Sequence, residues 1–310
     1  MKIAILAGGV GGARFVEALT EVVDPADVTV IANVGDDLEV HGLHVSPDLD
    51  TLLYTLAGLG DAERGWGRAG ETWNARETIE LLGGETWFQL GDRDLGLHLV
   101  RTDALREGET LSEVTERIAR AVGLELNLLP ATDDRLRTRI RTPTGEFEFQ
   151  EWFVARGHRD RADAVLYEGA ETAKPAPGVL EALAEAELVA IAPSNPFVSI
   201  GPIVAVTEIR AAVASRRDRV VAVSPLIGGR AVKGPADAMF DSLAGGTGAD
   251  QVAGCYEKLI GALVLDEADA SDADAVAARG MRPLVTRTLM SDPDARQALV
   301  ETVLGLVPAS

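Results

Sequence analysis

Cysteine, lysine and aromatic residues are scarce in this chain of 310 residues. The single cysteine, Cys255, excludes an internal disulfide and a metal site built from several thiolates. Arginine carries nearly all of the positive charge, because the only lysines are Lys2, Lys174, Lys233 and Lys258. The four histidines show no spacing typical of zinc ligands, and no nucleophilic triad is visible. An anionic ligand would therefore need a bound metal ion or arginines as its local cations.

Positive charge is scarce relative to negative charge. Asp and Glu number 49 against 29 Lys and Arg, which gives a formal net charge of −20. A field of this sign opposes nucleic-acid phosphates and anionic membranes. The most apolar region, residues 188–206, is interrupted by Pro193, Pro196 and Pro202 and cannot form a membrane span. The N-terminus opens into an apolar run without a signal-peptide pattern, so we expect a cytoplasmic protein without nucleic-acid or membrane partners.

Short apolar runs alternate with helical segments at both ends of the chain. Lys2–Leu6 and Val28–Ala32 are the first two predicted strands. Later strands are predicted at Ala164–Tyr167, Leu188–Ala192, Val220–Val223, Leu263–Leu265 and Arg282–Val285. Strands that alternate with helices in this way form a mainly parallel sheet covered on both faces. The sequence therefore predicts an α/β protein with a Rossmann-like, doubly wound sheet.

The middle of the chain interrupts this alternation. Helices are predicted at Asn74–Leu82, Leu95–Glu107 and Leu111–Val122. The third of them begins with the capping-box pattern of Thr110 and Glu113. Residues 136–154 then alternate around a Pro-Thr-Gly turn, as in a β-hairpin. We interpret residues 61–159 as an inserted helical and hairpin subdomain, and residues 1–60 and 160–310 as a Rossmann-like domain that binds nucleotide and phosphate.

A glycine-rich loop follows the first predicted strand and reads GGVGGAR from Gly8 to Arg14. Such loops let backbone N–H groups approach a phosphate at a helix N-terminus. The dinucleotide fingerprint is absent, because Arg14 takes the third glycine position and Asn33 ends the second strand where an acid is expected. The Lys-Ser/Thr pair of a P-loop is also absent. We predict a phosphate ligand here, and a tight turn that needs glycine is the alternative.

Four aspartates, Asp36, Asp37, Asp48 and Asp50, lie within fifteen positions after the second predicted strand. Carboxylates so close together repel one another unless a cation or hydrogen-bond donors compensate. Mg²⁺ bound through one or two carboxylates and substrate phosphates would do so. The alternative is that Asp50 caps a helix and the others are solvated loop acids. We favour a role in binding a metal ion or a hydroxyl group.

Asp92, Arg93 and Asp94 follow an apolar stretch at residues 87–90. Two acids beside an arginine could fix its guanidinium for contact with an anion. Helix capping by Asp94 together with a surface ion pair explains the pattern equally well. His98 and Arg101 lie beyond this run, and an isolated histidine is structural by default.

Two further loops follow predicted buried strands. Ser194 and Asn195 lie between two prolines, and Lys233 lies in a later glycine-rich loop. Hydroxyl and amide groups at the carboxyl end of a strand suit phosphate or sugar recognition, although turn chemistry alone would select the same residue types. A lysine can meet a phosphate as a point charge.

Taken together, these segments resemble the 2-phospho-L-lactate transferase family, which acts in the biosynthesis of the deazaflavin coenzyme F-420. The similar motifs occur in one order and are LAGGVGGARF, NVGDD, HGLHVSPDLDT, ERGWG, ETW, LGDRD, LLPATDD, FQEW, APSNP and SPLIGG. They extend from residue 1 to about residue 294. Several separate motifs in one order are more specific than any single glycine-rich loop.

The resemblance implies a reaction in which the terminal ribityl hydroxyl of the deazaflavin Fo attacks a phosphate of a guanosine diphosphate-linked three-carbon acid, and GMP leaves. It implies Mg²⁺ as cofactor, held by Asp37, Asp48 and Asp50. Asp50 and Asp48 would be catalytic, and Asp50, Arg93 and Asp92 would contact the deazaflavin in a pocket to which the insert contributes. The nucleotide and phosphate contacts would be Gly9, Val10, Gly11, Gly12, Arg14, Ser194, Asn195 and Lys233.

The three-carbon group of the donor cannot be read from the motifs alone. Members of the family use lactyl, enolpyruvyl or glyceryl donors, and the motifs GVGGARF and RGWG resemble the bacterial branch, which favours enolpyruvyl. An alternative of another class is a nucleotide-sugar-binding regulator resembling the gluconeogenesis-factor family, which carries a similar glycine loop and PDLD segment. The LGDRD and LLPATDD segments favour the transferase. A homodimer is compatible with either reading.

Overall fold

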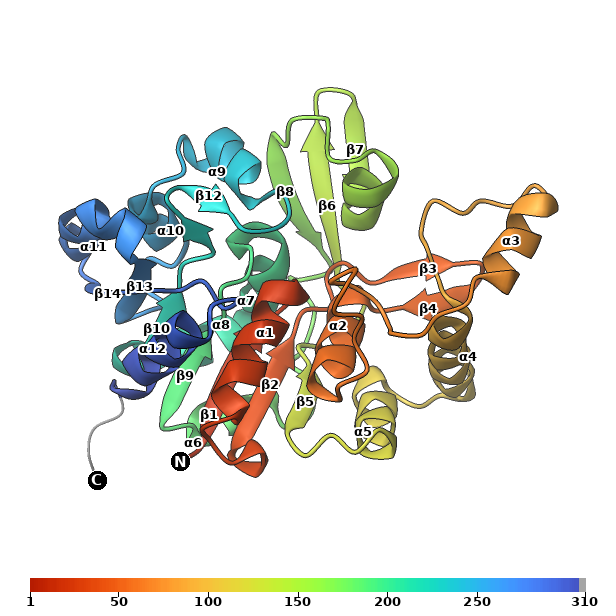
Figure 1. Ribbon diagram of the computed structural model, residues 1–310, viewed down its shortest axis with the longest axis horizontal. Coiled ribbons are helices and arrows are strands. Elements are labelled where there is room, and N and C mark those ends of the chain that lie inside the picture. The colour runs from red at the N-terminus through yellow and green to blue at the C-terminus, as the bar shows by residue number, and fades with distance from the viewer. Residues whose placement is uncertain (307–310) are drawn as a thin grey trace.

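A seven-stranded parallel sheet forms the centre of the protein in the computed structural model, which describes residues 1–306 (Figure 1). The order across the sheet is β14-β13-β10-β9-β1-β2-β5, and every neighbouring pair is parallel. The bounds are β1 Ile3–Ala7, β2 Val28–Ala32, β5 Asn127–Pro130, β9 Leu188–Ile191, β10 Val220–Val223, β13 Ala262–Asp266 and β14 Arg282–Thr286. This architecture confirms the predicted doubly wound α/β fold.

The strand order reverses between β1 and β9, which is where open α/β sheets bind their ligands. Ile3 of β1 is in register with Val28 of β2 on one side and with Leu188 of β9 on the other. The carboxyl ends of these three strands therefore lie at one edge of the sheet. The loops that leave them contain the glycines, the aspartates and the Ser194-Asn195 pair.

Helices cover both faces of the sheet and bury one continuous apolar core. α1 contacts α2 and α12 on one face, and α6 contacts α8. Figure 1 shows α1 and α12 crossing the near face. The bounds are α1 Gly9–Thr20, α2 Pro47–Leu56, α6 Val179–Glu185, α7 Gly201–Ala205, α8 Thr207–Ser215, α9 Ala236–Ala244, α10 Ala249–Cys255, α11 Ala273–Ala278 and α12 Pro293–Leu304. The strands of the central sheet after residue 170 lie where the sequence predicts them, whereas the helices α7 and α9 were not predicted.

Short elements connect these helices and strands. A small hairpin, β11 Leu226–Ile227 and β12 Arg230–Ala231, follows β10. Single helical turns occur at Pro25–Asp27, Glu151–Ala155, Pro196–Ile200, Arg217–Arg219 and Glu267–Asp272. Within residues 1–306 no single helix is long and apolar enough to cross a membrane, and only the pair 196–205 and 207–215, bent by 95°, reaches that length and composition together.

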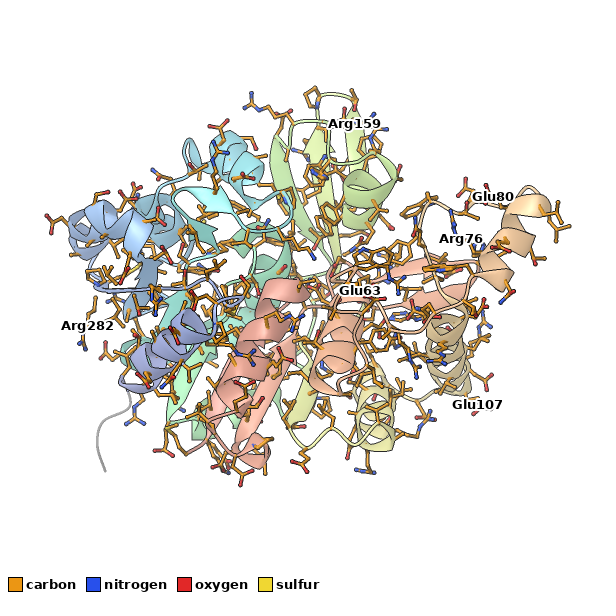
Figure 2. The ribbon with its side chains drawn as sticks, in the orientation of Figure 1. Glu63, Arg76, Glu80, Glu107, Arg159 and Arg282 are labelled. Atoms are coloured by element: carbon orange, nitrogen blue, oxygen red, sulfur yellow. The ribbon has the colours of Figure 1, made fainter. Side chains whose placement is uncertain are left out.

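An arm projects from the sheet domain between β2 and β5 (Figure 1). It contains a hairpin that the sequence did not predict, β3 Leu38–Val40 with β4 Leu43–Val45, and three predicted helices, α3 Asn74–Leu81, α4 Asp92–Glu107 and α5 Leu111–Ala121. The Thr110–Glu113 capping box is confirmed, because each residue binds the backbone N–H of the other. Figure 2 shows charged side chains, including Arg76 and Glu80, on α3, which buries none of its residues.

Two strands correct the organisation predicted from the sequence. β5 lies within the segment assigned to the insert, yet it pairs with β2 at the edge of the central sheet. β8, Ala164–Glu168, was expected in the central sheet, but it pairs antiparallel with β6, Arg137–Thr142, which forms the predicted hairpin with β7, Gly145–Glu148. The burial of β8 explains this, because its residues are half-buried or exposed, whereas parallel strands covered on both faces are fully buried.

Two glycine-to-alanine substitutions test the packing at the switch point. A Cβ atom at Gly11 would lie 2.6 Å from the backbone oxygen of Pro193, which cannot move without shifting the loop after β9. Gly11→Ala should lower the free energy of unfolding by about 1–3 kcal/mol. Gly96→Ala is the matched control at an exposed position inside α4, where an added Cβ meets nothing within 4 Å. It should raise the free energy of unfolding by about 0.5–1 kcal/mol. Chemical denaturation measures both, and equal effects of the same sign would contradict the packing argument.

Candidate active site

The glycines after β1 do not form a loop, as the sequence suggested, but the first turn of α1. Gly8 is the N-cap, and Gly9, with φ of 67°, is the first helical residue. A side chain at Gly8 would collide with the carboxylate of Asp48, and one at Gly12 would come within 2.8 Å of Ser194 Oγ. These glycines therefore let α1 pack closely against Asp48 and the loop after β9.

Two of the predicted phosphate-binding segments meet at the switch point. The hydroxyl of Ser194 donates to the carbonyl oxygen of Gly8 at 2.8 Å, and the Gly8 N–H lies 3.4 Å from the same hydroxyl. The side-chain oxygen of Asn195 accepts a hydrogen bond from the N–H of Phe197 at 2.9 Å. Asn195 therefore caps the helical turn at residues 196–200. Ser194 thus fixes the loop after β9 against the start of α1.

Asn33, at the end of β2, holds the acidic loops together. Its side-chain amide donates to Asp36 at 2.7 Å, to Asp48 at 2.9 Å and to the carbonyl oxygen of Val198 at 3.1 Å. Its amide oxygen accepts from the N–H of Gly35 at 2.7 Å, and the residue is completely buried. The sequence analysis used Asn33 only to exclude a dinucleotide site. Its position at the end of a central strand was the signal that could have identified it.

Burial and mutual repulsion raise the pKa of two of these carboxyl groups. The pKa of Asp36 lies well above its usual range because the group is buried and faces Asp48 and Asp37, although Gln150 donates to it at 2.9 Å. Burial raises the pKa of Asp48 to about 6, opposed by hydrogen bonds from Asn33 and the Gly9 N–H. The cluster therefore holds more negative charge than its protein donors compensate.

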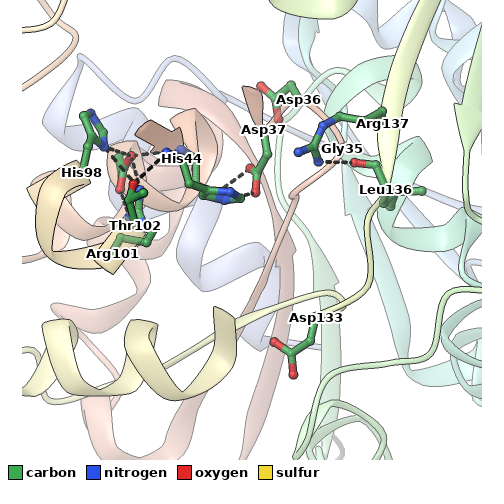
Figure 3. Close-up of polar contacts among 12 residues, drawn as sticks. Gly35, Asp36, Asp37, His44, His98, Arg101, Thr102, Asp133, Leu136 and Arg137 are labelled. Atoms are coloured by element: carbon green, nitrogen blue, oxygen red, sulfur yellow. Dashed lines mark hydrogen bonds and ion pairs between the residues drawn. The ribbon is translucent and has the colours of Figure 1, made fainter. Parts of the chain in front are cut away.

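Asp37 joins the cluster to the unpredicted hairpin. Ser46 donates its hydroxyl proton to one Asp37 oxygen at 2.5 Å, and His44 Nε2 lies 3.0 Å from the other. Figure 3 shows this contact between Asp37 and His44. The backbone N–H of His44 donates to Thr102 of α4 at 2.8 Å. Asp37 is therefore supported by a hairpin that is itself bonded to α4.

Asp50 forms a buried ion pair with Arg101, which the sequence analysis did not assign to the site. The helix α2 begins at Pro47 with Ser46 as N-cap, so the alternative that Asp50 is the cap is wrong. Arg101 Nη1 donates to one oxygen of Asp50 at 3.1 Å, and Nη2 donates to the other. Burial alone would lower the pKa of Arg101, but the charge and hydrogen bonds of Asp50 raise it. Arg101 and Asp50 are 2% and 5% exposed.

A second carboxylate lies behind this pair. His98 of α4 is buried, with Nδ1 3.8 Å from Asp50 and Nε2 3.3 Å from Asp94. The hydroxyl of Tyr54 donates to Asp94 at 2.5 Å. Figure 3 shows His98 and Arg101 together on α4, with dashed contacts between them. The array therefore joins α2, which carries Asp50 and Tyr54, to α4.

The acids flanking Arg93 do not hold its guanidinium, which corrects the sequence interpretation. Asp92 accepts hydrogen bonds from Ala75 N–H at 3.0 Å and Thr72 Oγ1 at 2.6 Å, and such bonds hold its pKa well below the usual range. It caps α3, and these contacts disfavour the deazaflavin contact expected of it. Glu71 caps α4 in return, by accepting from the N–H groups of Arg93 and Asp94 at 2.8 and 2.9 Å.

Arg93 itself is exposed at the start of α4, and its guanidinium forms no ion pair within residues 1–306. It lies beside Gly70, where an added Cβ would be 3.0 Å from Arg93 Nη1. Nearby, a cavity of about 170 Å³ is bounded by α1, α2 and the segment that joins α2 to Trp66. Arg14, Thr51, Tyr54 and Trp66 line it, and Thr51 and Tyr54 follow Asp50 on α2.

Two of the predicted ligand-binding cations have protein partners. Arg14 pairs with Glu17 at 3.0 Å on the outer face of α1, where it lines the cavity. Lys233 donates to the carbonyl oxygen of Gly65 at 3.0 Å, so it links the loop after β10 to the loop that carries Trp66. Both side chains are exposed enough to exchange these partners for a ligand. Their contact with phosphate stays a prediction.

The donor groups were tested as a Mg²⁺ site. In the part of the chain that the structure describes, no three His, Cys, Asp or Glu side chains converge as metal ligands. Asp50 does not fit, because the guanidinium of Arg101 already compensates its charge and would repel a second cation. Asp37 and Asp48 fit an ion that takes only one or two protein carboxylates and completes its shell with water and substrate phosphate. The pKa of Asp48 and of Asp36 is raised mainly by burial and also by the neighbouring carboxylates.

Comparisons with known proteins identify the family of this chain. Residues 3–297 match the family described as 2-phospho-L-lactate transferase CofD. The chain is 45% identical to a phosphoenolpyruvate transferase from Kitasatospora aureofaciens, with 99% of this chain and 98% of the relative covered. It is 43% identical to a phosphoenolpyruvate transferase from Streptomyces coelicolor over the same shares. A phosphoenolpyruvate transferase from Mycolicibacterium smegmatis is 39% identical over the full length of both chains.

A solved structure shows the same fold at lower sequence similarity. The crystal structure of a UPF0052 family member from Bacillus halodurans superposes with a TM-score of 0.64 at 15% identity, covering 98% of each chain. At this identity the likeness concerns the fold alone. The family match over nearly the whole chain, together with relatives of 39–45% identity, settles the assignment. The chain belongs to the 2-phospho-L-lactate transferase family and is a transferase.

Proposed function

We propose that this enzyme transfers a phosphoenolpyruvyl group from a guanosine diphosphate-linked donor to the terminal ribityl hydroxyl of the deazaflavin Fo, which releases GMP and gives dehydro coenzyme F-420-0. The observation that carries the proposal is the family match across residues 3–297, joined to relatives named phosphoenolpyruvate transferase. The strand switch point supplies a site of the right kind, with a helix N-terminus beside buried carboxylates.

The diphosphate half of the donor fits the start of α1. Backbone N–H groups at a helix N-terminus favour negative charge, and the glycines at positions 8, 11 and 12 let α1 begin close against Asp48 and the loop after β9. Ser194 and Asn195 border the same turn from the loop after β9. The predicted nucleotide contacts therefore gather at one edge of the sheet.

Asp37 and Asp48 are the proposed protein ligands of Mg²⁺. When bound, the ion would neutralise charge on the diphosphate and on the leaving GMP. The protein residues do the remaining work. Asn33 fixes Asp48 in position, and Ser46 and His44 fix Asp37, so both carboxylates are oriented before substrate arrives. Positioning and charge neutralisation supply most of the catalysis in phosphoryl transfer.

The proposed place of the acceptor is at the cavity between α1, α2 and the Trp66 loop. Trp66 is 44% exposed there, and the guanidinium of Arg64 lies 5.2 Å from its ring centre. An aromatic surface of this kind suits a flat heterocycle. Asp50 and Arg93 are the proposed polar contacts, since Asp50 precedes Thr51 in the cavity wall and Arg93 presents an uncommitted guanidinium. The attacking hydroxyl would then lie between this cavity and the start of α1.

A lactyl donor is the second candidate within the same activity, because the matched family is described by 2-phospho-L-lactate. The curated relatives named phosphoenolpyruvate transferase favour the enolpyruvyl group. The regulator alternative has weaker support, because its resemblance rests on the glycine loop and the PDLD segment, whereas the family match covers nearly the whole chain.

A coupled assay tests the proposed function. Fo, Mg²⁺ and a guanylyltransferase step would be supplied with phosphoenolpyruvate, phospholactate or phosphoglycerate in separate reactions, and the fluorescent products would be separated by mass. We expect dehydro coenzyme F-420-0 from phosphoenolpyruvate at the highest rate. A faster reaction with phospholactate would keep the transferase and correct the donor. No product from any donor, with unchanged Fo fluorescence on adding the protein, would contradict the proposal.

Asp48→Asn tests the proposed metal ligand. An asparagine side chain keeps an oxygen that can accept from Asn33, so the fold should persist while the negative charge is lost. We expect kcat to fall by about 100-fold or more at saturating Mg²⁺, measured with the coupled assay across a Mg²⁺ titration. Asp266→Asn is the control, because Asp266 is a buried acid bonded to Thr288 at 2.8 Å. A Mg²⁺ dependence that is unchanged in Asp48→Asn would remove Asp48 from the metal site.

Arg93→Lys tests the acceptor contact. Lysine keeps the charge but lacks the planar pair of donors, so the KM for Fo should rise by about 10-fold with little change in the KM of the donor. Steady-state kinetics with each substrate varied in turn measures both values. Arg117→Lys, at an exposed pair with Glu109, is the control and should leave both values unchanged. An unaltered KM for Fo in Arg93→Lys would exclude the contact.

A further inference from the structure

We propose that Arg101 is a positioning residue that fixes the Asp50 carboxylate as an acceptor of hydrogen bonds from the deazaflavin substrate and keeps it out of the metal site. The inference rests on the proposed function and deepens it, because it divides the four aspartates into two classes. Asp37 and Asp48 would serve the metal ion and the donor. Asp50 would serve the acceptor alone.

The geometry of the pair supports a fixed orientation. Two guanidinium nitrogens of Arg101 donate to the two different oxygens of Asp50, and the Ser46 N–H lies 3.4 Å from one of them. A two-pronged contact of this kind sets the plane of the carboxylate as well as its place. Each carboxylate oxygen has two lone pairs, so an oxygen that binds Arg101 still has one for a substrate hydroxyl.

The surroundings of Arg101 also point to more than a structural role. Arg101 lies 3.5 Å from His98 Nδ1, and His98 lies between the carboxylates of Asp50 and Asp94. Within residues 1–306, Arg101 Nε is buried without a hydrogen-bond partner. Buried charges and unpaired donors cost stability that apolar packing between two helices would not cost. The buried group formed by Arg101, His98 and Asp50 lies beside Tyr54, which lines the cavity. The orientation that it gives the Asp50 carboxylate explains why the protein bears this cost.

The same contact separates Asp50 from the metal chemistry. A divalent ion on Asp50 would have to compete with a guanidinium already bonded to both oxygens, and the two cations would repel each other. Asp37 and Asp48 have no arginine partner in the part of the chain that the structure describes, since their donors are Ser46, His44 and Asn33. Charge therefore directs the cation toward Asp37 and Asp48 and leaves Asp50 for neutral hydroxyl groups.

Arg101→Lys is the principal test, assayed in the full-length enzyme with Fo, Mg²⁺ and the donor each varied in turn. We expect the KM for Fo to rise about 10- to 100-fold, because a displaced carboxylate loses its aligned contact. The Mg²⁺ concentration for half-maximal activity should stay within about twofold of the wild-type value, because Asp50 does not hold the ion. The double variant Asp50→Asn with Arg101→Lys should have the same KM for Fo as Asp50→Asn alone. The reason is that each change removes the same contact.

Arg106→Lys is the matched control, since Arg106 lies on the same helix and donates to the carbonyl oxygen of Gly42 without touching Asp50. It should leave the KM for Fo unchanged. If thermal unfolding shows that Arg101→Lys is not folded, His98→Gln is assayed in its place. This variant should raise the KM for Fo by a smaller factor. A wild-type KM for Fo in the folded variant, or a shifted Mg²⁺ requirement, would overturn the inference while leaving the proposed function intact. An inactive wild-type enzyme would instead overturn both.

Discussion

The candidate site depends on one side-chain amide, that of Asn33. It comes directly after β2 and donates to Asp36, to Asp48 and to the loop after β9 through Val198. The two acidic loops after β2 are joined at this point to the loop after β9, which is 165 residues away in the sequence. A buried donor with no charge is suited to this task, because it holds two carboxylates together without neutralising them. Asn33 therefore fixes the relative positions of Asp36, Asp48 and the loop after β9.

The two groups of carboxylates are stabilised in different ways, which gives them different chemistry. Asp36, Asp37 and Asp48 are held by amide, hydroxyl and imidazole groups, and the pKa values of Asp36 and Asp48 are raised as a result of burial. Asp50 is held by a guanidinium that supplies a full positive charge. The two groups thus differ in their charge compensation, and the proposed function assigns the metal ion to Asp37 and Asp48 and the acceptor to Asp50. Phosphoryl transfer needs both, since the phosphates must be neutralised and the attacking hydroxyl must be aligned.

Much of this arrangement was predictable from the sequence, because alternation, turn residues and motif order are local signals. The strands of the central sheet except β5, the capping box at Thr110 and the aspartate cluster were recognised in this way. The family resemblance then indicated the transferase, which the family match confirms. Local signals also indicated that the loops after β1, β2 and β9 would carry the site, since such loops leave the sheet at its carboxyl edge.

The missed features depend on contacts between distant segments. Arg101 lies 51 residues from Asp50, and Gln150 lies 114 residues from Asp36, so no spacing rule joins them. β5 reads as a short apolar run within a helical region, and only its pairing with β2 shows that it belongs to the central sheet. The carboxylates of the LGDRD motif were misread for the same reason. The partners Thr72, Ala75 and Tyr54 lie 17 to 40 residues away in the sequence, which does not place them beside these carboxylates.

The arm between β2 and β5 gains its order from reciprocal capping. Asp92, at the start of α4, caps α3, while Glu71, before α3, caps α4. α3 buries none of its residues, and a helix of eight residues has little stability of its own. The two caps therefore hold α3 in place and tie the loop that carries Trp66 to the helix that carries Arg93 and Arg101. The ETW and LGDRD motifs form one structural unit, which places the guanidinium of Arg93, the aromatic wall of the cavity and the support of Asp50 in a fixed relation.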